Sequence, residues 1–137
     1  TTLFRSIAKE LDVEKYIDFL GFVDDINAYY QHCDLFSLPS KKEGFGIVYL
    51  EAMQYKKPVL GVNFGGPTDV IKHNETGYLC EYNNVLEISK YIMEIYTNPS
   101  KKNELGNNGY EYFINNFTYT HYQNNLKNIL IGNNNGN

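Results

Sequence analysis

The chain has 137 residues, of which 42% are hydrophobic and 20% are charged, with a formal net charge of -4. This length suffices for one domain with a core, and the acidic balance argues against nonspecific nucleic-acid binding, which needs a cationic surface. The apolar runs are shorter than the roughly 18 residues of a membrane-spanning helix, and no signal peptide opens the chain, so we expect a cytoplasmic protein.

Helices and strands alternate through the first part of the chain. An amphipathic helix opens it, a strand is predicted over residues 17–23, and Asp24 or Asp25 caps the short helix that follows. Further elements are predicted in the order strand 35–38, helix 46–55, strand 59–63, helix 67–72 and strand 78–81. The alternation predicts an α/β fold, a Rossmann-like doubly wound parallel sheet that binds ligands at the carboxyl ends of its strands.

Beyond residue 83 the pattern changes to helices alone. Asn84 with Glu87 three residues later predicts the start of one helix, because the two side chains form a capping pair. Asn98 followed by Pro99 predicts the start of the next helix. A last helix is expected to begin near residues 117–119.

The segment KKEGFGIVYLEAMQY carries the strongest functional pattern of the chain. Apolar residues surround every side of the helix predicted over residues 46–55, so we expect this helix to be buried with Glu51 on it. A buried, ionised carboxylate is costly unless it meets a basic side chain, backbone amides or the hydroxyls of a ligand. A structural ion pair with Lys41 or Lys42 is the alternative to a ligand.

The glycines before this helix predict a phosphate site. Gly44 and Gly46 flank a strand-to-helix turn, where a ligand approaches the backbone and the new helix offers unpaired amides. Because a helix rises about 1.5 Å per residue, Glu51 lies about 7.5 Å along the axis from Gly46. That distance suits a pyrophosphate on the amides and a ribose diol on the carboxylate.

Six short motifs follow one another in a fixed order. They are FLGFV at 19–23, DLFSLPS at 34–40, EGFG at 43–46 with EAM at 51–53, PV at 58–59, GGP at 65–67 and TG at 76–77. Together they resemble the family 4 retaining glycosyltransferases of GT-B type, over about residues 3–130. Seven residues separate the two glutamates, as in the signature of that family.

The resemblance implies a role for each residue of the motif. Glu43 is expected to be the catalytic residue beside the transferred sugar, and Glu51 to bind the ribose of the nucleotide-sugar donor. The residues implied in donor binding are Gly44, Phe45, Gly46, Ile47, Val48 and Glu51, with Phe22 and Val23 beside the base. Packing in the core is the alternative for Phe22 and Val23. No cofactor or metal is expected, since no Asp-x-Asp pair lies near the loop.

The resemblance also implies partners and a domain organisation. The donor is expected to be a UDP- or GDP-sugar, and the acceptor a glycan or lipid-linked molecule held by an N-terminal domain that this chain lacks. Peripheral membrane contact of the whole enzyme is left open. Residues 1–131 are predicted to form a C-terminal nucleotide-sugar-binding domain, incomplete at its N-terminus, and residues 132–137 a disordered tail. This fragment is expected to be inactive alone, and a non-catalytic nucleotide-sugar-binding or interaction module is the alternative.

Overall fold

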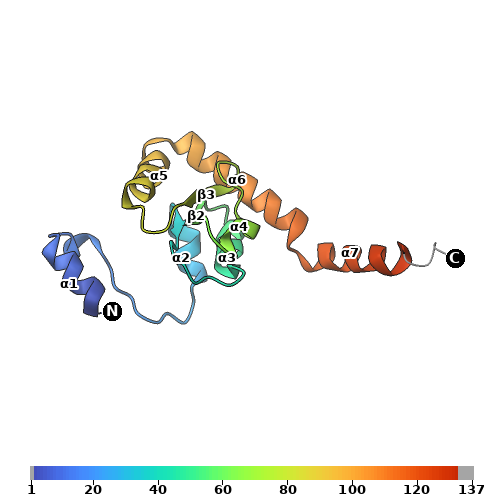
Figure 1. The fold of residues 1–137 in the computed structure, drawn as a ribbon, viewed down its shortest axis with the longest axis horizontal. Coiled ribbons are helices and arrows are strands. Elements are labelled where there is room, and N and C mark those ends of the chain that lie inside the picture. The colour runs from blue at the N-terminus through green and yellow to red at the C-terminus, as the bar shows by residue number, and fades with distance from the viewer. Residues whose placement is uncertain (1, 133–137) are drawn as a thin grey trace.

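The computed structural model describes residues 2–132. A small parallel sheet forms its centre, and helices cover both faces of the sheet (Figure 1). In chain order the elements are α1 (Thr2–Glu10), the 3-10 helix η1 (Glu14–Tyr16), α2 (Asn27–His32), β1 (Phe36–Ser37), α3 (Ile47–Gln54), β2 (Val59–Val62), α4 (Pro67–Val70), β3 (Gly77–Cys80), α5 (Val85–Thr97), α6 (Pro99–Asn116) and α7 (Tyr119–Gly132). None of the helices within residues 2–132 has the length and apolar character that crossing a membrane requires.

β2 is the central strand of the sheet, which has the order β1-β2-β3 with all strands parallel. The register pairs Phe36 with Val59, and Val59 with Gly77. Every residue of β2 is buried, as expected of a parallel strand that is covered on both faces. The predicted α/β fold with a parallel sheet is therefore confirmed.

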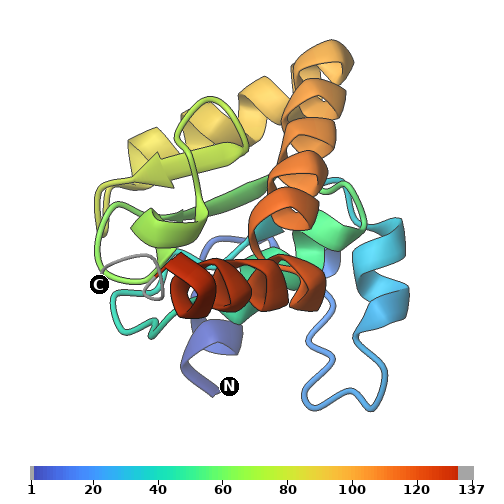
Figure 2. The ribbon, with the colours of Figure 1, turned by 90° about the vertical axis from the view of Figure 1, so that its right-hand side faces the viewer.

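Successive residues of β2 belong to two separate cores. Val59 packs in a core with Tyr49 of α3, which α2 and α4 complete on one face of the sheet. Leu60 packs on the other face with Tyr91 of α5 and Leu105 of α6. Figure 2 shows α5 on one side of the sheet and α3 on the other, and α6 contacts both of these helices.

α6 crosses the amino ends of β2 and β3. A Cβ atom on Gly106 would overlap the carbonyl oxygen of Lys56, and one on Gly109 would lie 3.3 Å from the carbonyl oxygen of Thr76. Glycine at these positions lets the helix lie against the backbone that enters the two strands. The amino ends of the strands are thereby covered.

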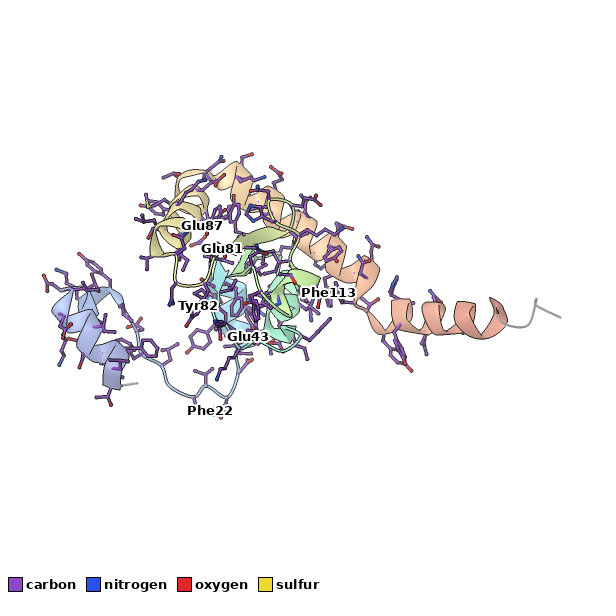
Figure 3. The ribbon with its side chains drawn as sticks, viewed as in Figure 1. Phe22, Glu43, Glu81, Tyr82, Glu87 and Phe113 are labelled. Carbon is purple, nitrogen blue, oxygen red and sulfur yellow. The ribbon has the colours of Figure 1, made fainter. Side chains whose placement is uncertain are left out.

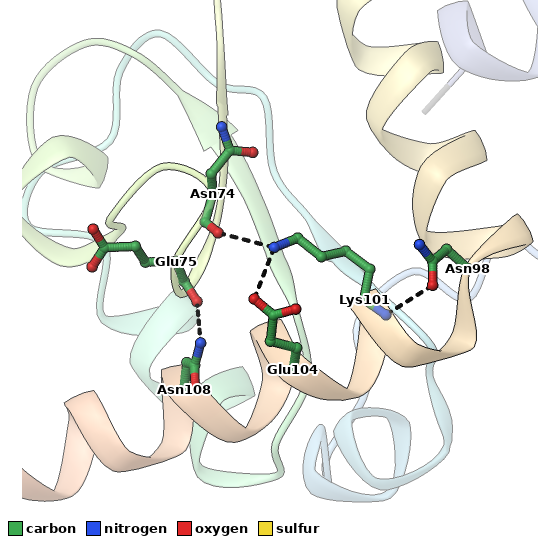
Figure 4. A network of polar contacts seen from close by, with 6 residues as sticks. All are labelled: Asn74, Glu75, Asn98, Lys101, Glu104 and Asn108. Carbon is green, nitrogen blue, oxygen red and sulfur yellow. Dashed lines mark hydrogen bonds and ion pairs between the residues drawn. The ribbon is translucent and has the colours of Figure 1, made fainter.

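Polar contacts tie α6 to the turn before β3 (Figure 4). The Nζ of Lys101 donates to the carbonyl oxygen of Asn74 at 3.3 Å and pairs with Glu104 at 2.9 Å. The side chain of Asn108 donates to the carbonyl oxygen of Glu75 at 3.1 Å. These contacts fix α6 at the amino edge of the sheet.

The helix starts predicted in the second half are confirmed. The Asn84 side chain accepts from the backbone N–H of Glu87 at 3.1 Å, and the Asn98 side chain accepts from that of Lys101 at 3.0 Å. Gly132 is the last residue of α7, and the rest of the predicted tail, residues 133–137, lies outside the described residues.

The prediction of a strand over residues 17–23 is wrong. The chain leaves η1 and runs as an extended, irregular segment to α2, without a hydrogen-bonded neighbour strand within residues 2–132. Gly21 has a φ of +72°, which interrupts strand geometry, and Phe22 is 92% exposed. Apolar residues favour a strand only where a neighbouring strand pairs with the backbone and a core receives the side chains.

The prediction that α3 is buried on every side is also wrong. Tyr49, Leu50, Ala52 and Met53 are buried, but Ile47 is 62% exposed and Glu51 is half-buried. Ile47 and Glu51 are four residues apart, so they lie on one face of the helix, and the described residues cover that face only in part. Glu51 is therefore reachable from solvent.

Candidate functional site

The turn between β1 and α3 is shaped by one glycine in a left-handed conformation. Gly46 precedes α3 with a φ of +83°, which favours glycine. A Cβ atom there would lie 2.8 Å from the ring of Tyr49. The backbone N–H groups of Ile47 and Val48, in the first turn of α3, have no acceptor within residues 2–132. These amides and the positive end of the helix dipole suit an anion.

The loop after β2 lies directly against this turn. A Cβ atom on Gly66 would overlap the carbonyl oxygen of Gly44 and approach the carbonyl carbon of Phe45 to 2.8 Å. Gly65 has a φ of +65° and lies beside the carbonyl oxygen of Glu43, 3.6 Å from where its Cβ would be. The loops after β1 and β2 therefore form one surface at the carboxyl edge of the sheet.

Tyr49 supports this surface from the core of the domain. Its ring is fully buried, and its Oη donates to the carbonyl oxygen of Leu38 at 2.7 Å. Burial raises the pKa of Tyr49 above its ordinary value, and the negative charge of Glu43 raises this pKa further.

Glu51 is paired with a tyrosine. The Oη of Tyr30, on α2, donates to Oε2 of Glu51 at 2.9 Å. Burial raises the pKa of Tyr30, and the hydrogen bond to Glu51 raises it further, so this hydroxyl stays a donor. The alternative of an ion pair with Lys41 or Lys42 is not seen: within the described part of the chain, no lysine pairs with Glu51.

A side chain that sequence reasoning missed, Tyr82, lies at the same edge. The Nζ of Lys41 lies 5.3 Å from the ring centroid of Tyr82, which follows β3. Figure 3 shows Tyr82 and Glu43 at this end of the sheet. Tyr30 was missed as well, because neither its spacing nor its neighbours in the sequence point to Glu51.

The structure does not bring every predicted donor-binding residue to this edge. Phe22 projects from the extended segment, away from Glu43 (Figure 3). Phe45 is 49% exposed and lies edge-on to Phe117, with the ring centroids 6.1 Å apart, at the connection between α6 and α7. Within residues 2–132, no group of three or more His, Cys, Asp or Glu side chains is arranged to hold a metal ion.

Comparison with protein families and curated proteins gives one answer. The model of the family "Glycosyl transferases group 1" matches residues 2–112. The alpha-1,3/1,6-mannosyltransferase ALG2 of Homo sapiens is 36% identical over 104 residues, which are 74% of this chain and 25% of that protein. The N-acetyl-alpha-D-glucosaminyl L-malate synthase of Bacillus anthracis is 34% identical over 100 residues, 73% of this chain and 26% of that protein. The chain thus spans about a quarter of the length of these relatives.

Solved structures share the fold. The C-terminal domain of the glycosyl transferase group 1 family protein LpcC from Francisella tularensis has a TM-score of 0.79 and 27% identity, over 86% of this chain and 62% of that one. Anabaena HepE in complex with UDP has a TM-score of 0.87 and 25% identity, over 96% of this chain and 36% of that one. The fold is that of GT-B glycosyltransferase C-terminal domains, and with the family match over residues 2–112 it shows that this chain belongs to the glycosyl transferases group 1 family.

Proposed function

We propose that this domain binds the nucleotide diphosphate sugar donor of a glycosyltransferase. One observation carries the proposal: the unpaired amides of Ile47 and Val48 and the half-buried carboxylate of Glu51 lie within about one turn of α3, which rises about 5.4 Å per turn. The amides suit the diphosphate, and the carboxylate suits the ribose diol. Solved relatives support this assignment, because HepE has been crystallised with UDP and with UDP-glucose.

The proposed reaction is hexosyl transfer with retention of configuration, of the family 4 type. The bond between the sugar's anomeric carbon and the diphosphate oxygen breaks, and a bond to an acceptor oxygen forms. The first turn of α3 stabilises the negative charge that develops on the leaving diphosphate. Glu43 lies beside the sugar, where its carboxylate supports the positive charge that develops on the ring. This role for the helix terminus requires no metal.

The proposal extends to the whole protein. The acceptor is a glycan or a lipid-linked molecule, bound outside the part of the relatives that this chain matches, and a lipid-linked acceptor would bring the enzyme to a membrane surface from the cytoplasm. The domain by itself is inactive, because the acceptor site is not part of it. A non-catalytic nucleotide-sugar-binding module would have the same donor loop, so only transfer by the longer protein separates the two functions.

Binding of UDP, GDP and ADP and of their sugar conjugates tests the donor site. At about 100 times its dissociation constant, a ligand stabilises the fold by about 2.7 kcal/mol and raises the melting midpoint by several degrees. Glu51→Ala should weaken nucleotide binding about 10- to 100-fold, since a hydrogen bond to a charged group contributes about 1.5–3 kcal/mol. Equal affinity in Glu51→Ala and the parent would remove Glu51 from the site.

Two variants complete the experiment. Gln54→Ala changes an exposed side chain one turn further along α3, and it should leave the affinity unchanged. Glu43→Ala should weaken binding of the nucleotide sugar relative to the free nucleotide, because Glu43 is placed beside the sugar and not beside the nucleotide. A loss of affinity for the free nucleotide of the same size would contradict that placement.

A further inference from the structure

We infer that Tyr30 is a positioning residue that holds the Glu51 carboxylate in the orientation that binds the ribose of the donor. The inference rests on the proposed function, and it adds a residue on α2 that no motif of the sequence marks. Its basis is the hydrogen bond from Tyr30 Oη to Glu51 Oε2, 2.9 Å long, between residues 21 positions apart.

The hydroxyl of Tyr30 is held in place by the surroundings of its ring. Tyr30 is 3% exposed, and its ring packs edge-on against Phe36 of β1, with centroids 5.6 Å apart. On its other side it stacks on Tyr55, with centroids 6.0 Å apart and planes inclined by 19°. Tyr55 is itself fixed, because its Oη donates to the side chain of Asn27 at 2.9 Å. A ring enclosed in this way presents its hydroxyl at one point.

Glu51 needs such support because it lies on the open face of α3. A half-exposed glutamate samples several rotamers, and a ligand must pay the entropy of fixing one of them. The bond from Tyr30 occupies one carboxylate oxygen, Oε2, and leaves Oε1 without a partner among the described residues. The free oxygen is the one available to a ribose hydroxyl. Tyr30 thus selects one orientation of Glu51 before the ligand arrives.

A purely structural role for Tyr30 makes a different prediction. Tyr30→Phe keeps the ring and its packing and removes only the hydroxyl. If the hydroxyl served packing alone, its loss would leave nucleotide affinity unchanged or would weaken all nucleotides equally. If it positions Glu51, the loss should be felt only by ligands that carry ribose hydroxyls.

The test measures the affinity of UDP and GDP and of their 2′,3′-dideoxy forms by titration calorimetry, with the more tightly bound base carried forward. The comparison covers the 137-residue chain, Tyr30→Phe, Glu51→Ala and the double variant, with Tyr29→Phe as a control. We expect Tyr30→Phe to weaken the ribonucleotide about tenfold and the dideoxynucleotide less than twofold. In the Glu51→Ala background, where the hydroxyl has no acceptor at residue 51, the same change should have no further effect. Tyr29→Phe alters the neighbouring, 43% exposed tyrosine of α2 and should change neither affinity.

The outcomes separate the inference from the function on which it rests. Wild-type affinity of Tyr30→Phe for the ribonucleotide would overturn the inference, and so would equal weakening of both ligands. An additive effect of Tyr30→Phe in the Glu51→Ala background would overturn it as well. If Glu51→Ala binds the ribonucleotide as tightly as the parent, or if the parent binds no nucleotide, the proposed site fails and the inference fails with it. Dideoxynucleotide binding by Tyr30→Phe also reports that the variant is folded.

Discussion

Glycine has a different structural role in two regions of the molecule, the loops after β1 and β2 and the extended segment of residues 17–26. Gly66 has helical dihedral angles that any residue adopts, yet a Cβ atom there would overlap the backbone of Gly44. Gly21, in the extended segment, has nothing within 4 Å of its Cβ position and is distinguished only by its φ of +72°. The first region is therefore fixed by contacts between loops, whereas the second follows the local preferences of its own backbone.

This difference matters for the candidate site. A ligand that binds at the β1–α3 turn meets a surface whose shape is set before binding. The loops after β1 and β2 contact each other, and Tyr49 packs against β2 and bonds to the chain after β1. A ligand that met residues 17–26 would have to order a segment with exposed Leu20 and Phe22 side chains. Preorganisation lowers the entropy lost on binding, so the first region is expected to provide most of the affinity.

The largest expected effect follows from the contact between the loops. Gly66→Ala should lower the free energy of unfolding by about 3 kcal/mol, because the added methyl group forces the two backbones apart. Gly44→Ala is the matched control: its Cβ meets nothing within 4 Å, so a change below about 0.5 kcal/mol is expected. Urea unfolding of the two variants measures the difference. Similar losses for both would show that the loops are not in contact in solution.

A smaller effect is expected from the hydroxyl that supports the same loops. Tyr49→Phe removes the 2.7 Å bond to the Leu38 carbonyl and should cost about 1 kcal/mol near pH 7. Tyr16→Phe, at a 78% exposed residue next to the extended segment, should change stability by less than about 0.5 kcal/mol. A larger loss for Tyr16→Phe than for Tyr49→Phe would reverse the comparison of the two regions.

The same tyrosine makes stability depend on alkaline pH. Burial raises the pKa of Tyr49 in the fold, whereas a tyrosine in the unfolded chain has a pKa of about 10. Above about pH 10 the unfolded chain releases a proton that the folded chain keeps, so stability falls by up to about 1.4 kcal/mol per pH unit for this group. Tyr49→Phe should reduce that fall, and its deficit against the parent should shrink from pH 8 to pH 11. A constant deficit over this range would show that Tyr49 ionises equally in both states.

The features that were predictable from the sequence are local ones. The caps at Asn84 and Asn98 depend on bonds to the residue three positions later, and both are seen. The parallel pairing of the strands was predicted because parallel strands need helical connections, which the alternation of elements supplies. The strand-to-helix turn at Gly46 was also predicted from its glycines, whereas the left-handed backbone of Gly46 was not.

The failures concern features that depend on distant neighbours. Residues 17–23 have the apolar residues of a strand, but pairing requires a second strand, which no local pattern supplies. The open face of α3 was missed because the apolar residues of a helix do not tell which of them a partner covers. The hydrogen bond from Tyr30 to Glu51 joins α2 to α3, which are separated by β1 in the sequence, and no local pattern predicts such a contact.

The smallest expected effect concerns Phe22, whose predicted contact with the nucleotide base is still untested. At 92% exposure its side chain stabilises little, so Phe22→Ala should change the free energy of unfolding by less than about 0.5 kcal/mol. In this chain the variant should also bind UDP within about twofold of the parent, because Phe22 lies away from Glu43 and the loops after β1 and β2 (Figure 3). Calorimetric titration beside Glu51→Ala gives the comparison. A tenfold loss of affinity would mean that residues 17–26 close over the bound nucleotide. The extended segment would then be ordered by the ligand, whereas the loops after β1 and β2 have a fixed shape without one.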